Sequence, residues 1–176
     1  MRYLVTGGAG FIGSHLAERL LAEGHGVLAL DDLSTGRYEN VAHLEKAGGF
    51  ELRVASVTDM AAVERCVTES QGVFHLASAV GVRLVVDQPV RTIETIVNGT
   101  DVVLRACARY RKPVLITSSS EVYGKGSKVP FSEGDDCVMG PTTTRRWAYA
   151  CAKALDEFLA LAHWHGNHRL SVEIPA

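Results

Sequence analysis

The sequence has no long hydrophobic run and no run of basic residues. No apolar stretch approaches the roughly 20 residues of a membrane-spanning helix, and Met1 to Val5 lead directly into glycines, so we expect no signal peptide. Lys and Arg number 18 and Asp and Glu 20, interspersed, so the net charge of −2 favours neither nucleic acid nor an anionic membrane as a partner. We expect a cytoplasmic protein whose partner is a small molecule.

Disulfide and metal-ligand patterns are also missing. The four cysteines are widely spaced and include no Cys-x-x-Cys pair, which favours buried free thiols over disulfides or metal ligands. His163, His165 and His168 lie close together in sequence, but positions i and i+2 of a helix point to different faces, so we expect no metal site.

Short apolar runs alternate with segments whose apolar residues recur every three or four positions. The first pattern is typical of strands and the second of helices. Predicted strands span 3–6, 27–31, 51–55, 73–76, 114–118 and 170–174, and predicted helices span 11–23, 59–69, 89–110 and 147–165. This alternation predicts an α/β fold, a Rossmann-type doubly wound parallel sheet of six strands with helices on both faces. The length of 176 residues fits one domain, residues 1–176.

A glycine-rich stretch joins the first predicted strand to the first predicted helix. Gly7, Gly10 and Gly13 lie where a backbone approaches a pyrophosphate at a helix N-terminus. Asp31 follows Gly13 by 18 residues at the end of the second predicted strand, where a carboxylate accepts hydrogen bonds from ribose hydroxyls and repels a 2′-phosphate. The strand, glycines, helix and acid together predict a dinucleotide site that favours NAD over NADP.

Tyr149 and Lys153 lie four residues apart in the last predicted helix and share one face. An ammonium beside a phenol stabilises the phenolate, so this pair predicts a general base whose pKa Lys153 lowers. The fifth predicted strand ends in Thr117-Ser118-Ser119-Ser120-Glu121-Val122-Tyr123-Gly124, which puts hydroxyls at the sheet edge where ligands bind. The candidate catalytic residues are Tyr149, Lys153, Ser119, Ser120 and Glu121.

As an ordered set, these segments resemble the extended short-chain dehydrogenase/reductase superfamily, in particular its nucleotide-sugar epimerase, dehydratase and decarboxylase branch. The resemblance covers essentially the whole chain. The similar segments are Thr6-Gly7-Gly8-Ala9-Gly10-Phe11-Ile12-Gly13-Ser14-His15, Asp31-Asp32-Leu33-Ser34-Thr35-Gly36, His75-Leu76-Ala77-Ser78, Asn98-Gly99-Thr100, Ser118-Ser119-Ser120-Glu121-Val122-Tyr123-Gly124 and Tyr149-Ala150-Cys151-Ala152-Lys153.

The resemblance implies bound NAD, with Asp31 on the adenosine ribose. It places the loop of Ser34, Thr35 and Gly36 near the adenosine. The other residues that it implies for NAD are Gly7, Gly10, Phe11, Ile12, Gly13, Asp32, Leu33, Ser56, Val57, Leu76, Ala77, Ser78, Asn98, Ser118, Tyr149 and Lys153.

The resemblance also implies a reaction on a nucleotide sugar, most often a UDP-sugar. Tyr149 would take the proton of the sugar 4-hydroxyl while hydride leaves C4 for NAD, Lys153 would hold the nicotinamide ribose, and Ser119 would bond the same hydroxyl. The 4-keto sugar is the intermediate that epimerases, decarboxylases and dehydratases share. We expect a 4-epimerase that acts on a UDP-hexose.

Glu121 keeps an alternative open. An acid two residues before Tyr123 resembles the pattern of UDP-glucuronate decarboxylases and sugar-nucleotide dehydratases, whereas 31–36 look more like 4-epimerases. An equally good interpretation is that Glu121 only caps its loop.

The sequence departs from the family pattern at two places. Relatives carry an acid after the third strand for the adenine amino group, whereas this chain has Ala55-Ser56-Val57, so we expect a weaker adenine contact. Relatives also continue into a C-terminal substrate domain that we expect to be absent here, which makes a truncated NAD-binding module without activity of its own a third hypothesis. Relatives pair through the helices equivalent to 89–110 and 147–165, so we expect a homodimer.

Overall fold

The central strand β1 (Arg2–Thr6) is buried on both faces. Leu4 and Val5 are fully buried but belong to two separate apolar clusters, because successive side chains of a strand point to opposite faces. The neighbouring strand β2 (Gly26–Asp31) divides Leu28 and Val27 between the same two clusters. A strand buried on both sides is typical of a parallel sheet that lies between layers of helices.

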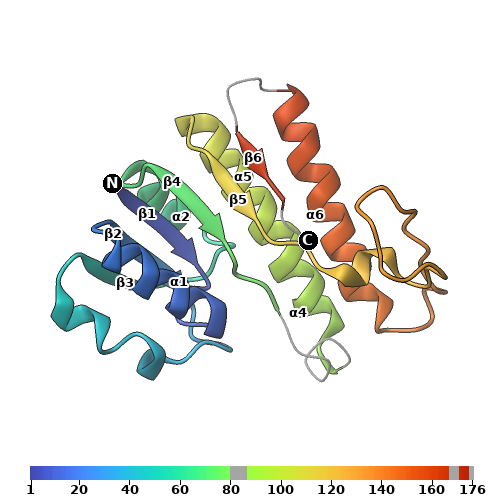
Figure 1. The fold of residues 1–176 in the computed structure, drawn as a ribbon, viewed down its shortest axis with the longest axis horizontal. Coiled ribbons are helices and arrows are strands. Elements are labelled where there is room, and N and C mark those ends of the chain that lie inside the picture. Colours follow the sequence, from blue (N-terminus) through green and yellow to red (C-terminus); the bar gives the residue numbers. More distant parts are fainter. Residues whose placement is uncertain (80–86, 167–170, 175–176) are drawn as a thin grey trace.

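The computed structural model describes residues 1–79, 87–166 and 171–174. All six strands are parallel, in the order β3-β2-β1-β4-β5-β6 (Figure 1). The order reverses between β1 and β4, so the carboxyl ends of these two strands flank the crevice where doubly wound sheets bind ligands. The predicted fold class is confirmed. The remaining strands are β3 (Phe50–Val54), β4 (Gly72–His75), β5 (Val114–Ile116) and β6 (Val172–Glu173).

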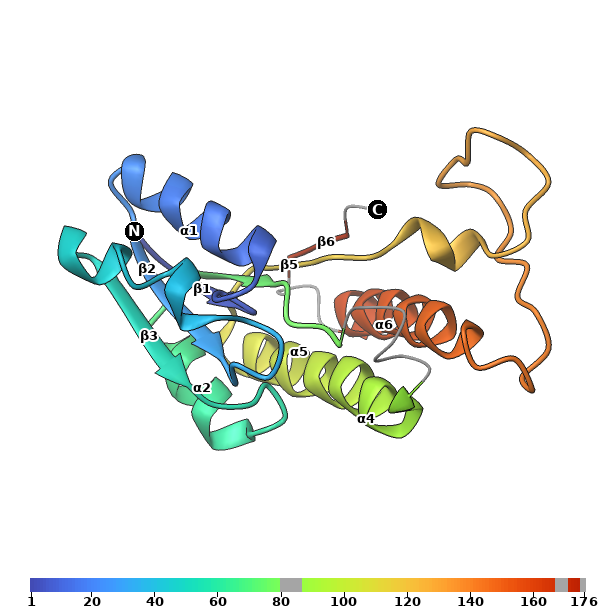
Figure 2. The ribbon, with the colours of Figure 1, turned by 90° about the horizontal axis from the view of Figure 1, so that it is seen from below.

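Helices cover both faces of the sheet, but unevenly. Figure 2 shows α1 (Phe11–Ala22) on one face and α2 (Met60–Thr68), α5 (Gly99–Tyr110) and α6 (Trp147–Gly166) on the other. The short helix α4 (Pro89–Ile93) continues through a π-helical segment, Glu94–Asn98, into α5. The predicted helix 89–110 is therefore one helical rod with a widened turn.

Local sequence signals account for where the helices begin. Asp59 caps α2, because its carboxylate accepts a hydrogen bond from the Ala62 N–H at 3.1 Å. Pro89 occupies the first turn of α4, where a missing N–H costs nothing. Val63 and Val67 lie one turn apart on the buried side of α2, as their spacing predicts.

Two predicted strands are shorter in the structure. β5 ends at Ile116, so Thr117 and the serines after it leave the sheet. β6 contains only Val172 and Glu173, and the predicted start at Leu170 lies outside the described residues. Among the residues that the structure describes, no helix is long and apolar enough to cross a membrane.

Leu104 of α5 gives a test of the packing between this helix and the sheet. It is fully buried in the larger apolar cluster, so Leu104→Ala removes buried surface and leaves a cavity. We expect the free energy of unfolding in urea to fall by about 2–5 kcal/mol. Leu155→Ala on the exposed side of α6 is the control, and an equal loss in both variants would contradict the packing described.

Candidate functional site

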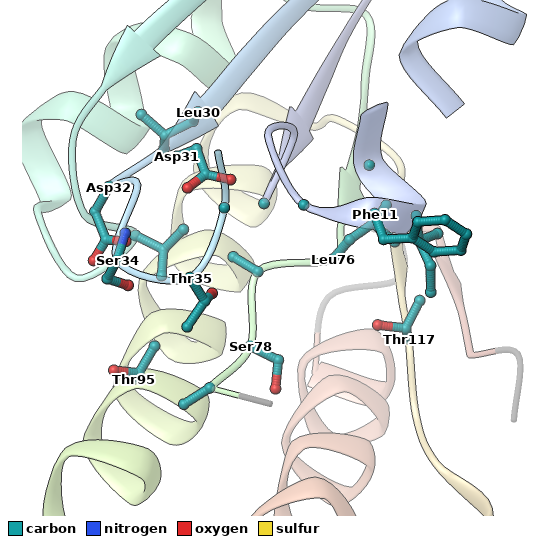
Figure 3. A pocket seen from close by; sticks show the side chains of 18 of the residues that line it. Phe11, Leu30, Asp31, Asp32, Ser34, Thr35, Leu76, Ser78, Thr95 and Thr117 are labelled. Carbon is teal, nitrogen blue, oxygen red and sulfur yellow. The ribbon is translucent and has the colours of Figure 1, made fainter. Parts of the chain in front are cut away.

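A cavity of about 340 Å³ opens at the carboxyl ends of β1, β2 and β4, where the strand order reverses. Figure 3 shows Asp31 and Asp32 at one end of it and Phe11 and Thr117 at the other. Most of the residues predicted for NAD line this cavity. They are Gly7, Gly10, Phe11, Ile12, Gly13, Asp31, Asp32, Ser34, Thr35, Gly36, Val57, Leu76, Ala77, Ser78, Tyr149 and Lys153.

Six residues beyond the predicted site residues also line the cavity. Leu30 and Ala79 directly adjoin predicted site residues, and Ala55 and Thr117 begin segments that the sequence already singles out. Arg91 and Thr95 lie four residues apart on one face of the α4 rod and belong to no motif. Only the docking of that rod against the sheet brings them to the cavity.

Seven predicted residues do not line the cavity and stay predictions. Ser118 donates a hydrogen bond to the Glu157 carboxylate, and the Ser119 hydroxyl accepts the Glu121 N–H at 3.3 Å at the start of a 3₁₀ turn, Ser120–Tyr123. The set is Leu33, Ser56, Asn98, Ser118, Ser119, Ser120 and Glu121.

The glycine-rich stretch forms a very tight turn between β1 and α1. The Gly7 N–H donates to the Leu30 carbonyl at 2.8 Å, and the Gly10 N–H donates to the Gly7 carbonyl at 3.0 Å. A Cβ atom on Gly13 would lie 2.2 Å from the Gly7 carbonyl oxygen. Gly10 is the N-cap of α1 and has no side chain to cap it, so this helix end is open to an anion.

Asp31 is held rigidly at the end of β2. One carboxylate oxygen accepts the Ala9 N–H at 2.9 Å, and the other accepts the Leu33 N–H at 2.8 Å. A Cβ atom on Gly36 would lie 2.8 Å from both oxygens, so the missing side chain keeps the space beside the carboxylate free. Each oxygen retains a lone pair for a further donor, which suits a pair of ribose hydroxyls.

Tyr149 is half-buried, and its pKa is raised rather than lowered. Burial is the main cause, a hydrogen bond with the Ser119 hydroxyl lowers the pKa, and the charges of Glu121 and Asp156 raise it. The expectation that Lys153 lowers this pKa is therefore not met. The Lys153 ammonium instead donates to the Asp156 carboxylate, with 3.1 Å between Nζ and Oδ2, and both side chains are almost fully buried.

A buried polar chain runs beneath the cavity from β1 to α5. The Thr6 hydroxyl oxygen accepts the N–H groups of Leu76 and Ala77 at 3.2 and 3.1 Å, so its own proton points to Nδ1 of His75, 2.7 Å away. His75 Nε2 then carries the ring proton and donates to Thr100 Oγ1 at 3.1 Å. Burial, with a smaller effect of the Lys153 charge, lowers the His75 pKa to about 3.

Comparisons with known proteins agree with this geometry. The family described as GDP-mannose 4,6 dehydratase matches residues 4–173. The chain is 42% identical over 162 residues to the UDP-N-acetyl-alpha-D-glucosaminuronate decarboxylase of Bacillus cytotoxicus. The aligned region covers 92% of this chain and 50% of that protein. The chain is also 41% identical over 161 residues to the UDP-glucose 4-epimerase of Mycolicibacterium smegmatis. That alignment covers 89% of this chain and 49% of the epimerase.

The fold is similar to that of a solved dehydratase. DesIV, the dTDP-glucose 4,6-dehydratase of Streptomyces venezuelae solved with NAD and TYD bound, matches with a TM-score of 0.88 and 28% identity, over 99% of this chain and 54% of that chain. The resemblance drawn from the motifs is thus confirmed. The chain spans about half the length of the curated relatives that it matches.

Gly13→Ala tests the tight turn. The new Cβ meets a backbone carbonyl that has no flexible end to move, so we expect the free energy of unfolding to fall by about 1–3 kcal/mol. Urea titration measures this loss. The control is Gly134→Ala, because nothing lies within 4 Å of a Cβ built there. Equal stability of the two variants would contradict the turn geometry.

His75→Gln tests the buried neutral histidine. The unfolded chain binds a proton at His75 near its ordinary pKa of 6.5, whereas the folded chain binds it only near 3. The stability that the neutral ring contributes is therefore complete above about pH 6.5 and is lost as the pH falls toward about 3. Across this window we expect the free energy of unfolding of the wild-type chain to fall by roughly 1 kcal/mol more per pH unit than that of His75→Gln.

Urea unfolding at several pH values measures the difference between the two chains. His43→Gln is the matched control, because that histidine is exposed. Parallel acid profiles of wild type and His75→Gln would show that His75 is not buried as a neutral ring.

Proposed function

The chain belongs to the GDP-mannose 4,6 dehydratase family, and from this we propose that it binds NAD and oxidises a UDP-sugar at C4. The observation that carries the proposal is the meeting of the glycine turn, Asp31 and the Tyr149–Lys153 pair in one cavity. Since the chain spans about half the length of its relatives, the activity of the isolated chain is part of the proposal.

The cavity residues fit NAD. The open N-terminus of α1 suits the pyrophosphate, and Asp31 suits the adenosine ribose and disfavours a 2′-phosphate. Ser78 adds an independent sign, because its buried hydroxyl lines the cavity and has no hydrogen-bond partner among the described residues (Figure 3). In this proposal Lys153, which also lines the cavity, holds the nicotinamide ribose.

The chain's own residues supply the proton chemistry. Tyr149 takes the proton of the sugar 4-hydroxyl, and Ser119, which hydrogen-bonds to Tyr149, stabilises the phenolate that this requires. Bound NAD supplies reversible hydride acceptance at C4, so that a 4-keto sugar forms and is reduced again. Partial burial of Tyr149 at the cavity wall strengthens its polar contacts.

A 4-epimerase acting on a UDP-hexose is the first candidate, supported by the 41% identical UDP-glucose 4-epimerase. A UDP-glucuronate decarboxylase is the second candidate. Glu121 supports it, because this carboxylate lies close enough to Tyr149 to raise its pKa, and so does the 42% identical decarboxylase. Decarboxylation and epimerisation share the oxidation at C4 and differ in what happens to C5.

The homodimer remains a prediction. α6 exposes Leu155 and Phe158, and the α4 rod exposes Ile93, so both helices present apolar side chains that a second copy would cover.

Tyr149→Phe tests the role of the phenol. The purified chain is loaded with NAD and incubated with UDP-glucose, and UDP-galactose is measured by chromatography. We expect Tyr149→Phe to lower turnover by about 10²–10⁴-fold, since it removes the proton acceptor, while the affinity for NAD in calorimetry changes little. Tyr110→Phe on α5 is the control. Unchanged turnover in Tyr149→Phe would contradict the assignment.

A second assay with the same purified chain separates the candidates. If the wild-type chain releases carbon dioxide from UDP-glucuronate but does not convert UDP-glucose, and Glu121→Gln loses this release, the decarboxylase is favoured. Binding of NAD with no conversion of any sugar nucleotide would favour the module without activity. A wild-type chain that binds no NAD would overturn the proposed function.

A further inference from the structure

The ion pair of Lys153 and Asp156 is unusual for its burial. The Lys153 side chain is 5% exposed and that of Asp156 is 2% exposed. By contrast, the Asp101–Arg105 pair on α5 exposes 29% and 64% of its two side chains. A surface pair contributes little to stability, whereas breaking a buried pair leaves a charge in a medium that solvates it poorly. The burial of Lys153 therefore depends on a counter-charge.

Asp156 is the group that provides this counter-charge. It lies three residues after Lys153 on α6, so both side chains leave the helix on the same side. Burial raises the pKa of Asp156, whereas the Lys153 ammonium and, to a smaller extent, Thr100 of α5 lower it. The Thr100 oxygen already accepts the His75 ring proton, so its own proton is free for the carboxylate.

A chain of hydrogen bonds connects Thr100, which faces Asp156, to the wall of the cavity. From Thr100 it passes through His75 to Thr6, which holds the N–H groups of Leu76 and Ala77. Leu76 and Ala77 line the cavity that also contains Lys153. The buried ion pair with Asp156 Oδ2 therefore holds the ammonium beside this wall, and the other Asp156 oxygen, Oδ1, has no hydrogen-bond partner among the described residues.

We propose that Asp156 is a positioning residue, which keeps the Lys153 ammonium charged inside the fold and fixes it at the point of the cavity where it meets a bound dinucleotide. This inference rests on the proposed binding of NAD. Without Asp156, the ammonium is buried without a counter-charge and gives up its proton more readily. The neutral amine that results has no charge and has one N–H fewer to donate to the ribose.

Several charged groups face this part of the site. Glu121 faces Tyr149 from the 3₁₀ turn, and Glu157 on α6 raises the pKa of Asp156. His75 faces Lys153 from β4 but stays neutral above about pH 3. A pH dependence of NAD affinity that Asp156→Asn shows and wild type lacks is therefore assigned to the group that Asp156 contacts, the Lys153 ammonium.

The first experiment measures stability without NAD. Asp156→Asn keeps the shape of the side chain and removes its charge, and we expect a clear drop of the unfolding midpoint. Lys153→Met/Asp156→Asn removes both charges, and we expect it to recover most of that drop. Asp101→Asn is the matched control, since it breaks an exposed pair by the same substitution.

The second experiment measures NAD affinity by calorimetry from about pH 7 to about pH 10, the range in which an unprotected lysine titrates. We expect Asp156→Asn to bind NAD about tenfold more weakly than wild type at about pH 7, and to weaken further as the pH rises. Wild type and Asp101→Asn should weaken less than Asp156→Asn across this range. The double variant should bind weakly at every pH, because it has no ammonium to lose.

Each outcome decides the proposal. Equal instability of Asp156→Asn and the double variant would show that Asp156 supports the fold without acting through Lys153. An Asp156→Asn chain that fails to fold, while the double variant folds, supports the pairing. NAD binding by Asp156→Asn with the affinity and pH profile of wild type would overturn the positioning role. If the wild-type chain binds no NAD, the proposed function fails, and the stability comparison still tests the ion pair.

Discussion

The close return of the chain between β1 and α1 is the constraint on which the site depends. A Cβ atom on Gly13 would lie 2.2 Å from the Gly7 carbonyl oxygen, so the helix begins directly against the strand that feeds it. This brings the open N-terminus of α1 to the edge of the sheet and the Ala9 N–H to the Asp31 carboxylate. The anion site and the acid beside it are therefore built by one turn.

Charge at the other end of the cavity is balanced within the fold. Tyr149 and Lys153 share a helix face, but the buried ammonium is paired with Asp156, and burial raises the pKa of the phenol. Ser119 lowers the pKa of Tyr149, so the group that favours the phenolate comes from the turn after β5 and not from the lysine one helical turn away. The carboxylates of Glu121 and Asp156 raise the pKa of Tyr149 and so oppose formation of its phenolate.

Much of the fold was predictable, because its signals are local. The glycine turn appears as expected, and the Asp59 cap and the apolar spacing of α2 likewise depend on only a few neighbouring residues. Strand ends were less predictable. The predicted fifth strand extends to Ser118, but Thr117 and Ser118 leave the sheet, and Ser118 hydrogen-bonds to Glu157 of α6 before the turn at Ser120–Tyr123.

The sequence by itself determined which residues could form a dinucleotide site, since residue type and spacing along one helix or turn are sufficient for the glycines, Asp31, Tyr149 and Lys153. Only the tertiary structure decided which partner each polar group takes. No motif singles out Asp156, and His75 enters only as part of the segment His75-Leu76-Ala77-Ser78, yet both side chains are buried in the structure. A buried charge or ring has to find its partner across elements that are far apart in the chain, and spacing along the chain does not contain that information.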